Sequence, residues 1–264
     1  MRLQQLSCLL AGLTIAGSCL AKDASNDQGI YAGLFGGLGT AGSASLQQKG
    51  AVHLLPTRFK LPIDASGYTD TPQVALGGVQ IGYDWNRHTP SSAWSLKPAA
   101  ELEGIYLGKH TPVGTMPVTP RALGTQYVSI PTTAGILLAN AVLTIQTPYS
   151  DRILPYIGAG AGIAMVSIKG ADSANPSEPG INHFNSDPDA RDSALALQFK
   201  AGIKAAVQKN LYLFAEYRYL SINATRYTFG ATDYPGQHLP TDSWDVRLGR
   251  QHYNLFVAGL QYQF

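Results

Sequence analysis

The ionisable side chains that interrupt apolar segments are the residues of this chain whose types and spacing could do chemistry. Glu101 and Glu103 flank Leu102, and Glu216 and Arg218 are again two residues apart. A spacing of two places such pairs on one face of an extended segment. There, acids and bases could form ion pairs, line a path for charged solutes or exchange protons. Four acids and three bases, with a net formal charge of −1, make up the set: Asp84, Glu101, Glu103, Lys200, Lys204, Glu216 and Arg218.

Eight segments of alternating polarity must position these side chains. Each contains apolar or aromatic residues at every second position, often with glycine, which is the pattern of β-strands. The predicted strands are 29–38, 73–85, 95–107, 138–146, 154–168, 194–207, 211–223 and 252–264.

The first 21 residues, MRLQQLSCLLAGLTIAGSCLA, predict a secretory signal peptide. They have a basic start, a short apolar run and small residues before Ala21. Cleavage after Ala21 would remove Cys8 and Cys19, so neither a disulfide nor a thiolate nucleophile or ligand is expected in the mature domain, residues 22–264. A lipidated Cys19 is the alternative, but residues 16–18 lack the leucine usual at such sites.

The connections between the strands alternate between long and short. Long connections span 39–72, 108–137, 169–193 and 224–251, and short ones span 86–94, 147–153 and 208–210. In an up-and-down antiparallel sheet this order places every long connection at one end. Because an open sheet would leave two unpaired edges, we expect closure into a barrel. The apolar stretches AVHLLP and VSIPTTAGILLA predict an extension of the barrel wall or a partner contact, and leave ten strands as an alternative.

The distribution of charge over the strands distinguishes a membrane barrel from a soluble one. Only 14% of the 264 residues are charged, against about 25% in ordinary soluble domains. The charged residues share one strand face and the apolar residues the other, whereas a soluble ligand-binding barrel has the reverse arrangement. We therefore predict an apolar, lipid-facing wall and a lumen filled by paired charges. A net charge of +2 gives no indication of a nucleic-acid partner.

Glycines and aromatic residues fit the same arrangement. In PYIGAGAGIA, Gly158, Gly160 and Gly162 have inward parity and leave room for long side chains opposite. A dinucleotide-binding glycine loop would need a following helix, but this segment continues as a strand. Aromatic residues near strand ends predict interfacial girdles, namely Tyr83, Trp85, Tyr149, Tyr156, Tyr212, Tyr262 and Phe264.

The chain ends in VAGLQYQF, in which Gly259, Tyr262 and Phe264 have the spacing of the terminal strand signal of bacterial outer-membrane barrels. Together with PYIGAGAGIA and FKAGIKAAVQKNLYLFAEYRYL, this ending resembles the eight-stranded family of the outer-membrane protein A barrel, the opacity proteins and related surface antigens. The resemblance implies an all-β, eight-stranded antiparallel up-and-down barrel in a Gram-negative outer membrane, with four long extracellular loops. It also implies contact with lipids, lipopolysaccharide and the barrel-assembly machinery.

A structural and surface-antigen role without catalysis is the function that these features favour, with loops that bind a host or environmental ligand. Narrow, porin-like permeation is the alternative, and a lipid A-modifying enzyme is a third. The enzyme would need a histidine beside a serine, but His252 is followed by Tyr253 and Asn254. The sequence predicts no catalytic residue, no cofactor and no metal site.

Overall fold

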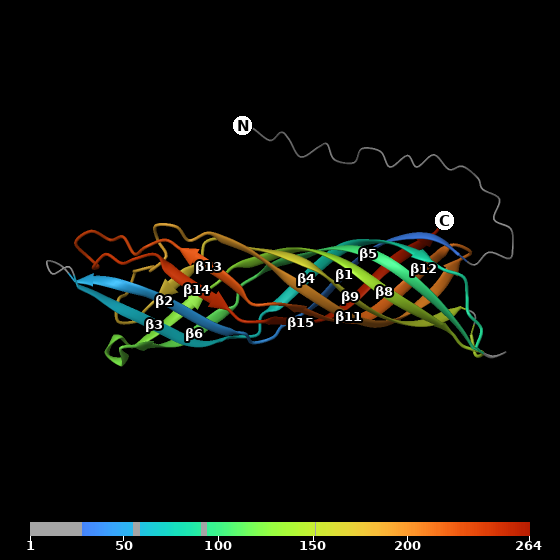
Figure 1. The fold of residues 1–264 in the computed structure, drawn as a ribbon, viewed down its shortest axis with the longest axis horizontal. Coiled ribbons are helices and arrows are strands. Elements are labelled where there is room, and N and C mark those ends of the chain that lie inside the picture. Colours follow the sequence, from blue (N-terminus) through green and yellow to red (C-terminus); the bar gives the residue numbers. More distant parts are fainter. Residues whose placement is uncertain (1–27, 55–58, 91–93, 151) are drawn as a thin grey trace, which may run out of the picture.

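The computed structural model describes residues 28–54, 59–90, 94–150 and 152–264 (Figure 1). The predicted signal peptide, residues 1–21, lies outside these residues. The described chain is an elongated β-structure, with the carboxyl terminus near one end (Figure 1). No helix among the described residues is both long enough and apolar enough to span a membrane.

Eight long strands form a closed antiparallel barrel. Their order around the wall is β1-β15-β12-β11-β9-β8-β5-β4, and β1 pairs with β15 from Tyr31 opposite Gln263 to Ala41 opposite Tyr253. Closure therefore satisfies the backbone groups that an open sheet would leave unpaired. The barrel strands are β1 (Gly29–Ala41), β4 (Gln73–Asp84), β5 (Ser95–His110), β8 (Thr132–Gln146), β9 (Ile153–Ile168), β11 (Ala190–Gln208), β12 (Leu211–Ile222) and β15 (Gln251–Gln263).

Each of the eight predicted strands corresponds to one barrel strand, so the prediction of an eight-stranded barrel is confirmed. The bounds differ most in β8 and β11, which begin at Thr132 and Ala190 instead of at residues 138 and 194. Both additions lie at the long-connection end, where the strands extend toward a second sheet.

The two faces of the wall have the predicted polarity. Val79 and Phe199 are 62% and 60% exposed on the outer face, whereas Gln80 and Glu103 are 6% and 0% exposed inside. This contrast follows from the period of two in a strand, which sends successive side chains to opposite faces. The barrel thus has an apolar outer surface and a polar interior.

The long connections do not remain irregular loops. They form a second, seven-stranded sheet in the order β10-β7-β6-β3-β2-β14-β13, at the end opposite the carboxyl terminus (Figure 1). The barrel wall is thus extended as the apolar stretches predicted, and the alternative of ten barrel strands is wrong. The second sheet consists of β2 (Ser45–Leu54), β3 (Phe59–Thr69), β6 (Val113–Thr119), β7 (Thr125–Ser129), β10 (Asp172–Ala174), β13 (Thr225–Phe229) and β14 (Trp244–Leu248), with the short 3-10 helix η1 (Arg121–Leu123) between β6 and β7.

The second sheet encloses an apolar core. Phe184, from the connection between β10 and β11, is fully buried and stacks on Phe229 with ring centroids 4.4 Å apart. Met116 and Trp244 are buried in the same core. The second sheet is therefore a packed structure held by buried apolar surface.

Exposed aromatic side chains gather at the short-turn end of the barrel. Tyr83 packs edge-on against Trp85, and Tyr262 packs edge-on against Phe264, with centroids 5.9 and 5.1 Å apart. The assignments of Tyr156 and Tyr212 to this girdle were wrong. Tyr156 shares its parity with Gly158 and points inward, where it is 4% exposed. Tyr212 shares the inward parity of Phe214 and Glu216.

Candidate functional site

A cluster of buried ion pairs crosses the barrel interior. The Lys200 ammonium on β11 donates to Glu101 Oε1 at 2.5 Å and to Glu103 Oε1 at 2.8 Å, both on β5. Arg218 on β12 donates to Glu103 Oε1 at 2.9 Å and to Glu216 on its own strand. Five of the seven residues predicted for the lumen therefore lie together as one ionic cluster.

Neutral side chains complete the hydrogen bonding of the ionic cluster. The Tyr31 hydroxyl donates to Glu101 Oε2 at 2.9 Å, and the Tyr156 hydroxyl donates to Glu216 Oε2 at 2.7 Å. The Gln198 amide donates to Glu103 Oε2 at 2.6 Å. Buried charges persist when each is paired and hydrogen-bonded. Every carboxylate of the cluster meets that condition.

The other two predicted lumen residues lie closer to the short-turn end. Asp84 pairs with Lys97, whose ammonium is 3.0 Å from Asp84 Oδ2. Lys204 lies over the rings of Tyr31 and Tyr156, with its ammonium 5.3 and 5.1 Å from their centroids, which is cation–π geometry.

Lys97 was missed in the sequence analysis. It has the same parity on β5 as Glu101 and Glu103, which was a usable signal. Its inclusion brings the formal charge of the lumen set from −1 to zero.

Glycines make room for the bulky side chains of the lumen. A Cβ at Gly82 would lie 2.3 Å from the Tyr31 ring, and one at Gly78 would lie 2.4 Å from the ring of Phe35. Phe35 in turn lies under the Arg218 guanidinium, 4.1 Å from its ring centroid. A Cβ at Gly158 would meet the Lys200 side chain at 3.1 Å. Each of these glycines is paired with the bulky residue on the neighbouring strand, and it therefore leaves room for that side chain to lie along the wall.

The terminal strand residues lie on both faces of β15. Tyr262 and Phe264 are about half exposed on the outer wall. Gly259 points inward, and a Cβ there would lie 2.5 Å from the Phe214 ring and 2.4 Å from the Leu34 carbonyl oxygen. Gly259 thus has a packing role in the finished barrel.

A groove of about 750 Å³ lies where the second sheet meets the barrel. Arg247 and Arg250 line it beside Tyr68. Arg226 is directly opposite Arg247 in the β13–β14 pair, so two like charges are adjacent. All three guanidinium groups are exposed, and no salt bridge neutralises them within the described part of the chain.

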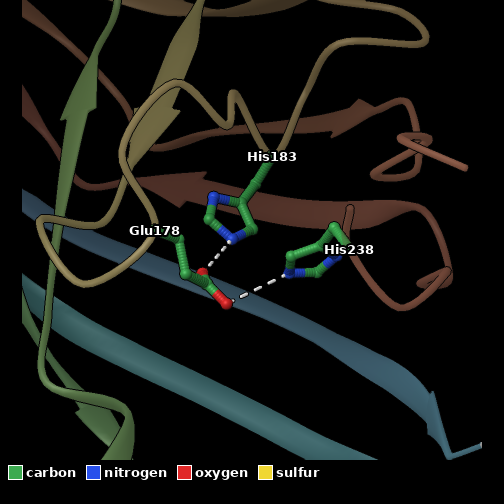
Figure 2. Close-up of side chains that lie close together, drawn as sticks. All are labelled: Glu178, His183 and His238. Atoms are coloured by element: carbon green, nitrogen blue, oxygen red, sulfur yellow. Dashed lines mark hydrogen bonds and ion pairs between the residues drawn. The ribbon is translucent and has the colours of Figure 1, made fainter. Parts of the chain in front are cut away.

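The structure also brings together three potential metal ligands that sequence reasoning missed. Glu178 and His183 follow β10, and His238 lies between β13 and β14 (Figure 2). Three strands separate His183 from His238 in the sequence, so no local motif marks the cluster. His252 lies elsewhere, stacked on Tyr219, whose hydroxyl is 2.7 Å from His252 Nδ1.

Residues 8–264 match the family described as outer membrane protein beta-barrel domain. The chain belongs to this family. Membership agrees with the closed barrel and the apolar wall, and it locates the protein in the bacterial outer membrane. No curated protein matches this sequence.

Solved outer-membrane barrels are similar to this family member over most of their length. The outer membrane protease OmpT of Escherichia coli is 10% identical, with 88% of this chain and 97% of that chain covered and a TM-score of 0.41. Neisserial surface protein A is 14% identical, with 89% and 97% covered and a TM-score of 0.38. OprG of Pseudomonas aeruginosa is also 14% identical, with 89% and 96% covered and a TM-score of 0.39.

Proposed function

We propose that this protein is a non-catalytic outer-membrane barrel whose lumen is closed by ion pairs and whose second sheet is displayed on the cell surface. The observation that carries the proposal is the ionic cluster in which Glu103 binds both Lys200 and Arg218. An eight-stranded barrel has an interior that side chains just fill. Here the filling side chains hold one another by charge, which favours a plug over a path for solutes.

The packed second sheet supports a role in surface display. Outside the cell it would offer a fixed surface to a host or environmental ligand, because its strands are paired and its core is apolar. A prearranged surface loses less conformational entropy on binding than mobile loops do. In this orientation the short turns face the periplasm.

In this proposal the amino-terminal residues direct export and the carboxyl-terminal strand directs assembly. Residues 1–21 act as the cleaved signal peptide. The barrel-assembly machinery recognises the terminal strand through Gly259, Tyr262 and Phe264. The exposed rings of Tyr262 and Phe264 support this assignment, since they are available on the outer wall.

The groove lined by Arg247 and Arg250, here called the arginine groove, has the charge to bind lipopolysaccharide. Arg247, Arg250 and Arg226 surround the barrel–sheet junction with exposed positive charge. Guanidinium groups bind phosphate through paired, charge-assisted hydrogen bonds. In the proposed orientation the junction lies beside the outer leaflet, where lipid A carries its phosphates.

Conductance in planar bilayers tests the closed lumen. We expect the purified wild-type protein to give no ohmic steps. The double variant Glu103→Ala/Arg218→Ala removes one acid and one base together, so it should open a water path and give salt-dependent steps. The matched control Lys97→Ala/Asp84→Ala removes a pair outside the ionic cluster and should stay closed.

Retention of the heat-dependent electrophoretic mobility shift shows that each variant is folded. Stepwise, salt-dependent conductance from the folded wild type would contradict the plug and support the alternative of narrow solute permeation.

A further inference from the structure

Two histidines and one glutamate from separate connections converge at the long-connection end (Figure 2). His183 Nε2 is 3.1 Å from Glu178 Oε2, and His238 Nε2 is 3.3 Å from Glu178 Oε1. The three ligand atoms lie within 4.8 Å of one another. The side chains of His183 and His238 are only 7% and 9% exposed, whereas the Glu178 side chain is 37% exposed, so the two imidazoles are largely shielded from water and the carboxylate is open to it on one side.

Backbone carbonyls fix which nitrogen of each imidazole faces the glutamate. A carbonyl oxygen can only accept, so His183 Nδ1 donates to the Ser173 carbonyl oxygen at 2.7 Å and His238 Nδ1 donates to the Leu239 carbonyl oxygen at 2.5 Å. The Gln126 amide nitrogen also lies 3.0 Å from His183 Nδ1, and it donates to Ser173 Oγ at 2.7 Å. In neutral histidine the other nitrogen then carries a lone pair. Both Nε2 lone pairs are therefore directed at a carboxylate, and three acceptors face one another with no donor among them.

A single metal ion can relieve this conflict for both rings, because the two imidazoles are neighbours with centroids 5.3 Å apart. A divalent metal ion accepts electron pairs from all three groups at once. Hydrogen bonds from the second nitrogen of each ring to a carbonyl are also the usual support for metal-bound histidine.

The ligand set and spacing select the kind of metal. Two imidazole nitrogens and one carboxylate oxygen suit Zn²⁺, whereas Ca²⁺ and Mg²⁺ prefer oxygen ligands. Tetrahedral bonds of about 2.0–2.1 Å place neighbouring ligand atoms roughly 3.3 Å apart. The His183–Glu178 and His238–Glu178 distances, 3.1 and 3.3 Å, are close to this value. They run to the two different oxygens of Glu178, so a shared metal ion is bound either through both oxygens or after a small turn of the carboxylate. A cavity of about 50 Å³ adjoins the three residues and can hold a water as the fourth ligand.

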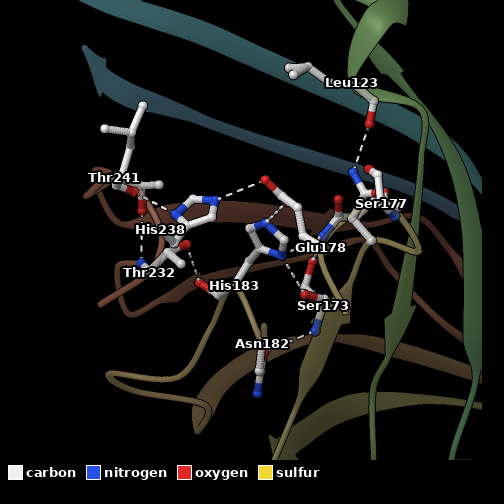
Figure 3. Close-up of polar contacts among 12 residues, drawn as sticks. Leu123, Ser173, Ser177, Glu178, Asn182, His183, Thr232, His238 and Thr241 are labelled. Atoms are coloured by element: carbon white, nitrogen blue, oxygen red, sulfur yellow. Dashed lines mark hydrogen bonds and ion pairs between the residues drawn. The ribbon is translucent and has the colours of Figure 1, made fainter. Parts of the chain in front are cut away.

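Polar contacts order both connections around these ligands (Figure 3). The Asn182 side-chain oxygen accepts from the backbone amides of Ser173 and Phe184, which fixes the segment that carries His183. The Thr232 hydroxyl, from the β13–β14 connection, donates to the His183 carbonyl oxygen at 3.1 Å. The site is thus preorganised by the same contacts that hold the two connections together.

We propose that Glu178, His183 and His238 form a Zn²⁺ site that clamps the β10–β11 connection to the β13–β14 connection at the exposed end of the second sheet. The metal closes a long loop, because Glu178 and His238 are 60 positions apart in the sequence. Such a cross-link stabilises the second sheet by restricting the alternatives open to these connections.

Isothermal titration of the folded, chelator-treated full barrel with Zn²⁺ tests the site. We expect one equivalent to bind to the wild type. His183→Ala and His238→Ala should each raise the Kd by more than about 100-fold, since loss of a hydrogen-bond partner of a ligand alone costs about 10- to 100-fold. Glu178→Gln keeps the shape of the side chain but lowers its charge, and should also weaken binding. His88→Ala, which removes an exposed histidine at the short-turn end, is the matched control and should bind as the wild type does.

Amide exchange gives a second readout. At a free Zn²⁺ concentration ten times the Kd, amide exchange of residues 173–183 and 234–239 in the wild type should be about 10-fold slower than without Zn²⁺. In His238→Ala, Zn²⁺ should not change the exchange rate. The mobility shift on heating verifies that each variant still forms a barrel. Absence of Zn²⁺ binding to the folded wild type, or one equivalent bound with unchanged Kd by both histidine variants, would overturn the proposal.

Discussion

Lys200 and Arg218 lie directly opposite each other on β11 and β12, and both donate to the same oxygen of Glu103, at 2.8 and 2.9 Å. Like charges at directly opposed strand positions repel. Glu103 therefore holds together two cations that would otherwise destabilise the adjacent strands. This makes Glu103 the central acid of the ionic cluster.

Glu103→Gln should lower the free energy of unfolding by about 3–5 kcal/mol, because it leaves buried cations without their shared partner. Glu216→Gln should cost less, since among the described residues Glu216 pairs with Arg218 alone, whereas Glu103 pairs with both cations. Lys49→Gln, at the exposed Lys49–Asp64 pair, is the control and should cost about 1 kcal/mol or less. Urea unfolding in lipid vesicles measures all three, and an equal loss for Glu103→Gln and Lys49→Gln would contradict the central role of Glu103.

The arginine groove predicts a salt-sensitive affinity for lipopolysaccharide. Arg247→Ala/Arg250→Ala should weaken binding at least about 10-fold, since a charge-assisted hydrogen bond contributes about 1.5–3 kcal/mol. Lys209→Ala removes an exposed charge at the opposite, short-turn end and should have no effect. Binding of lipid A to protein in nanodiscs can be followed at several salt concentrations. Affinity that is the same for all three proteins would exclude the groove as the binding site.

Variants at Gly259 and Phe264 test two different roles of the terminal strand, namely packing in the finished barrel and recognition by the assembly machinery. Gly259→Ala places a methyl group against Phe214 and the Leu34 carbonyl, so we expect a less stable barrel even when the protein folds in detergent without other factors.

Phe264→Ala keeps the backbone hydrogen bond from the residue 264 amide to the Ile30 carbonyl oxygen and removes a half-exposed ring that packs on Tyr262, so it should change stability in detergent little and slow assembly in cells. The midpoint temperature of the electrophoretic mobility shift measures stability, and the amount of folded protein in outer membranes measures assembly. The two measurements together distinguish the two effects. Normal assembly of Phe264→Ala would refute the recognition role of Phe264.

The contacts of Asp242 should make the stability of the second sheet depend on pH in the acid range. Its carboxylate accepts hydrogen bonds from Lys60 and His53, and these contacts hold the pKa of the carboxyl below its ordinary value. Because the pKa is lower in the folded state, the stabilisation is present at neutral pH and is lost as the pH falls through the folded pKa.

We therefore expect the protection factors of the His53 and Asp242 amides, which bond to Pro240 and Ala51 across this contact, to fall in strong acid. Asp242→Asn should show reduced protection already at neutral pH, with little further change in acid. Hydrogen exchange corrected for the intrinsic rate measures this. Equal protection of wild type and variant at neutral pH would show that the carboxylate contributes nothing to the contact.

The sequence alone determined the barrel because its evidence is local. Alternation at every second residue defines a strand and its two faces, and the order of long and short connections defines an up-and-down topology. The inward parity of Glu101, Lys200 and Arg218 followed directly. Tyr156 was misassigned because position near a strand end was given more weight than parity, which by itself predicts an inward ring.

Only the tertiary structure decided which side chains meet. Register around the closed wall brings Glu103 to Lys200 and Arg218, and sends Asp84 to Lys97 instead. Folding of the long connections into a second sheet likewise brings His238 to Glu178 and His183. Such contacts join residues far apart in the chain, and their distances depend on strand stagger, sheet closure and the packing of the connections. No local periodicity carries that information, whereas the face on which a side chain lies is set by its immediate neighbours.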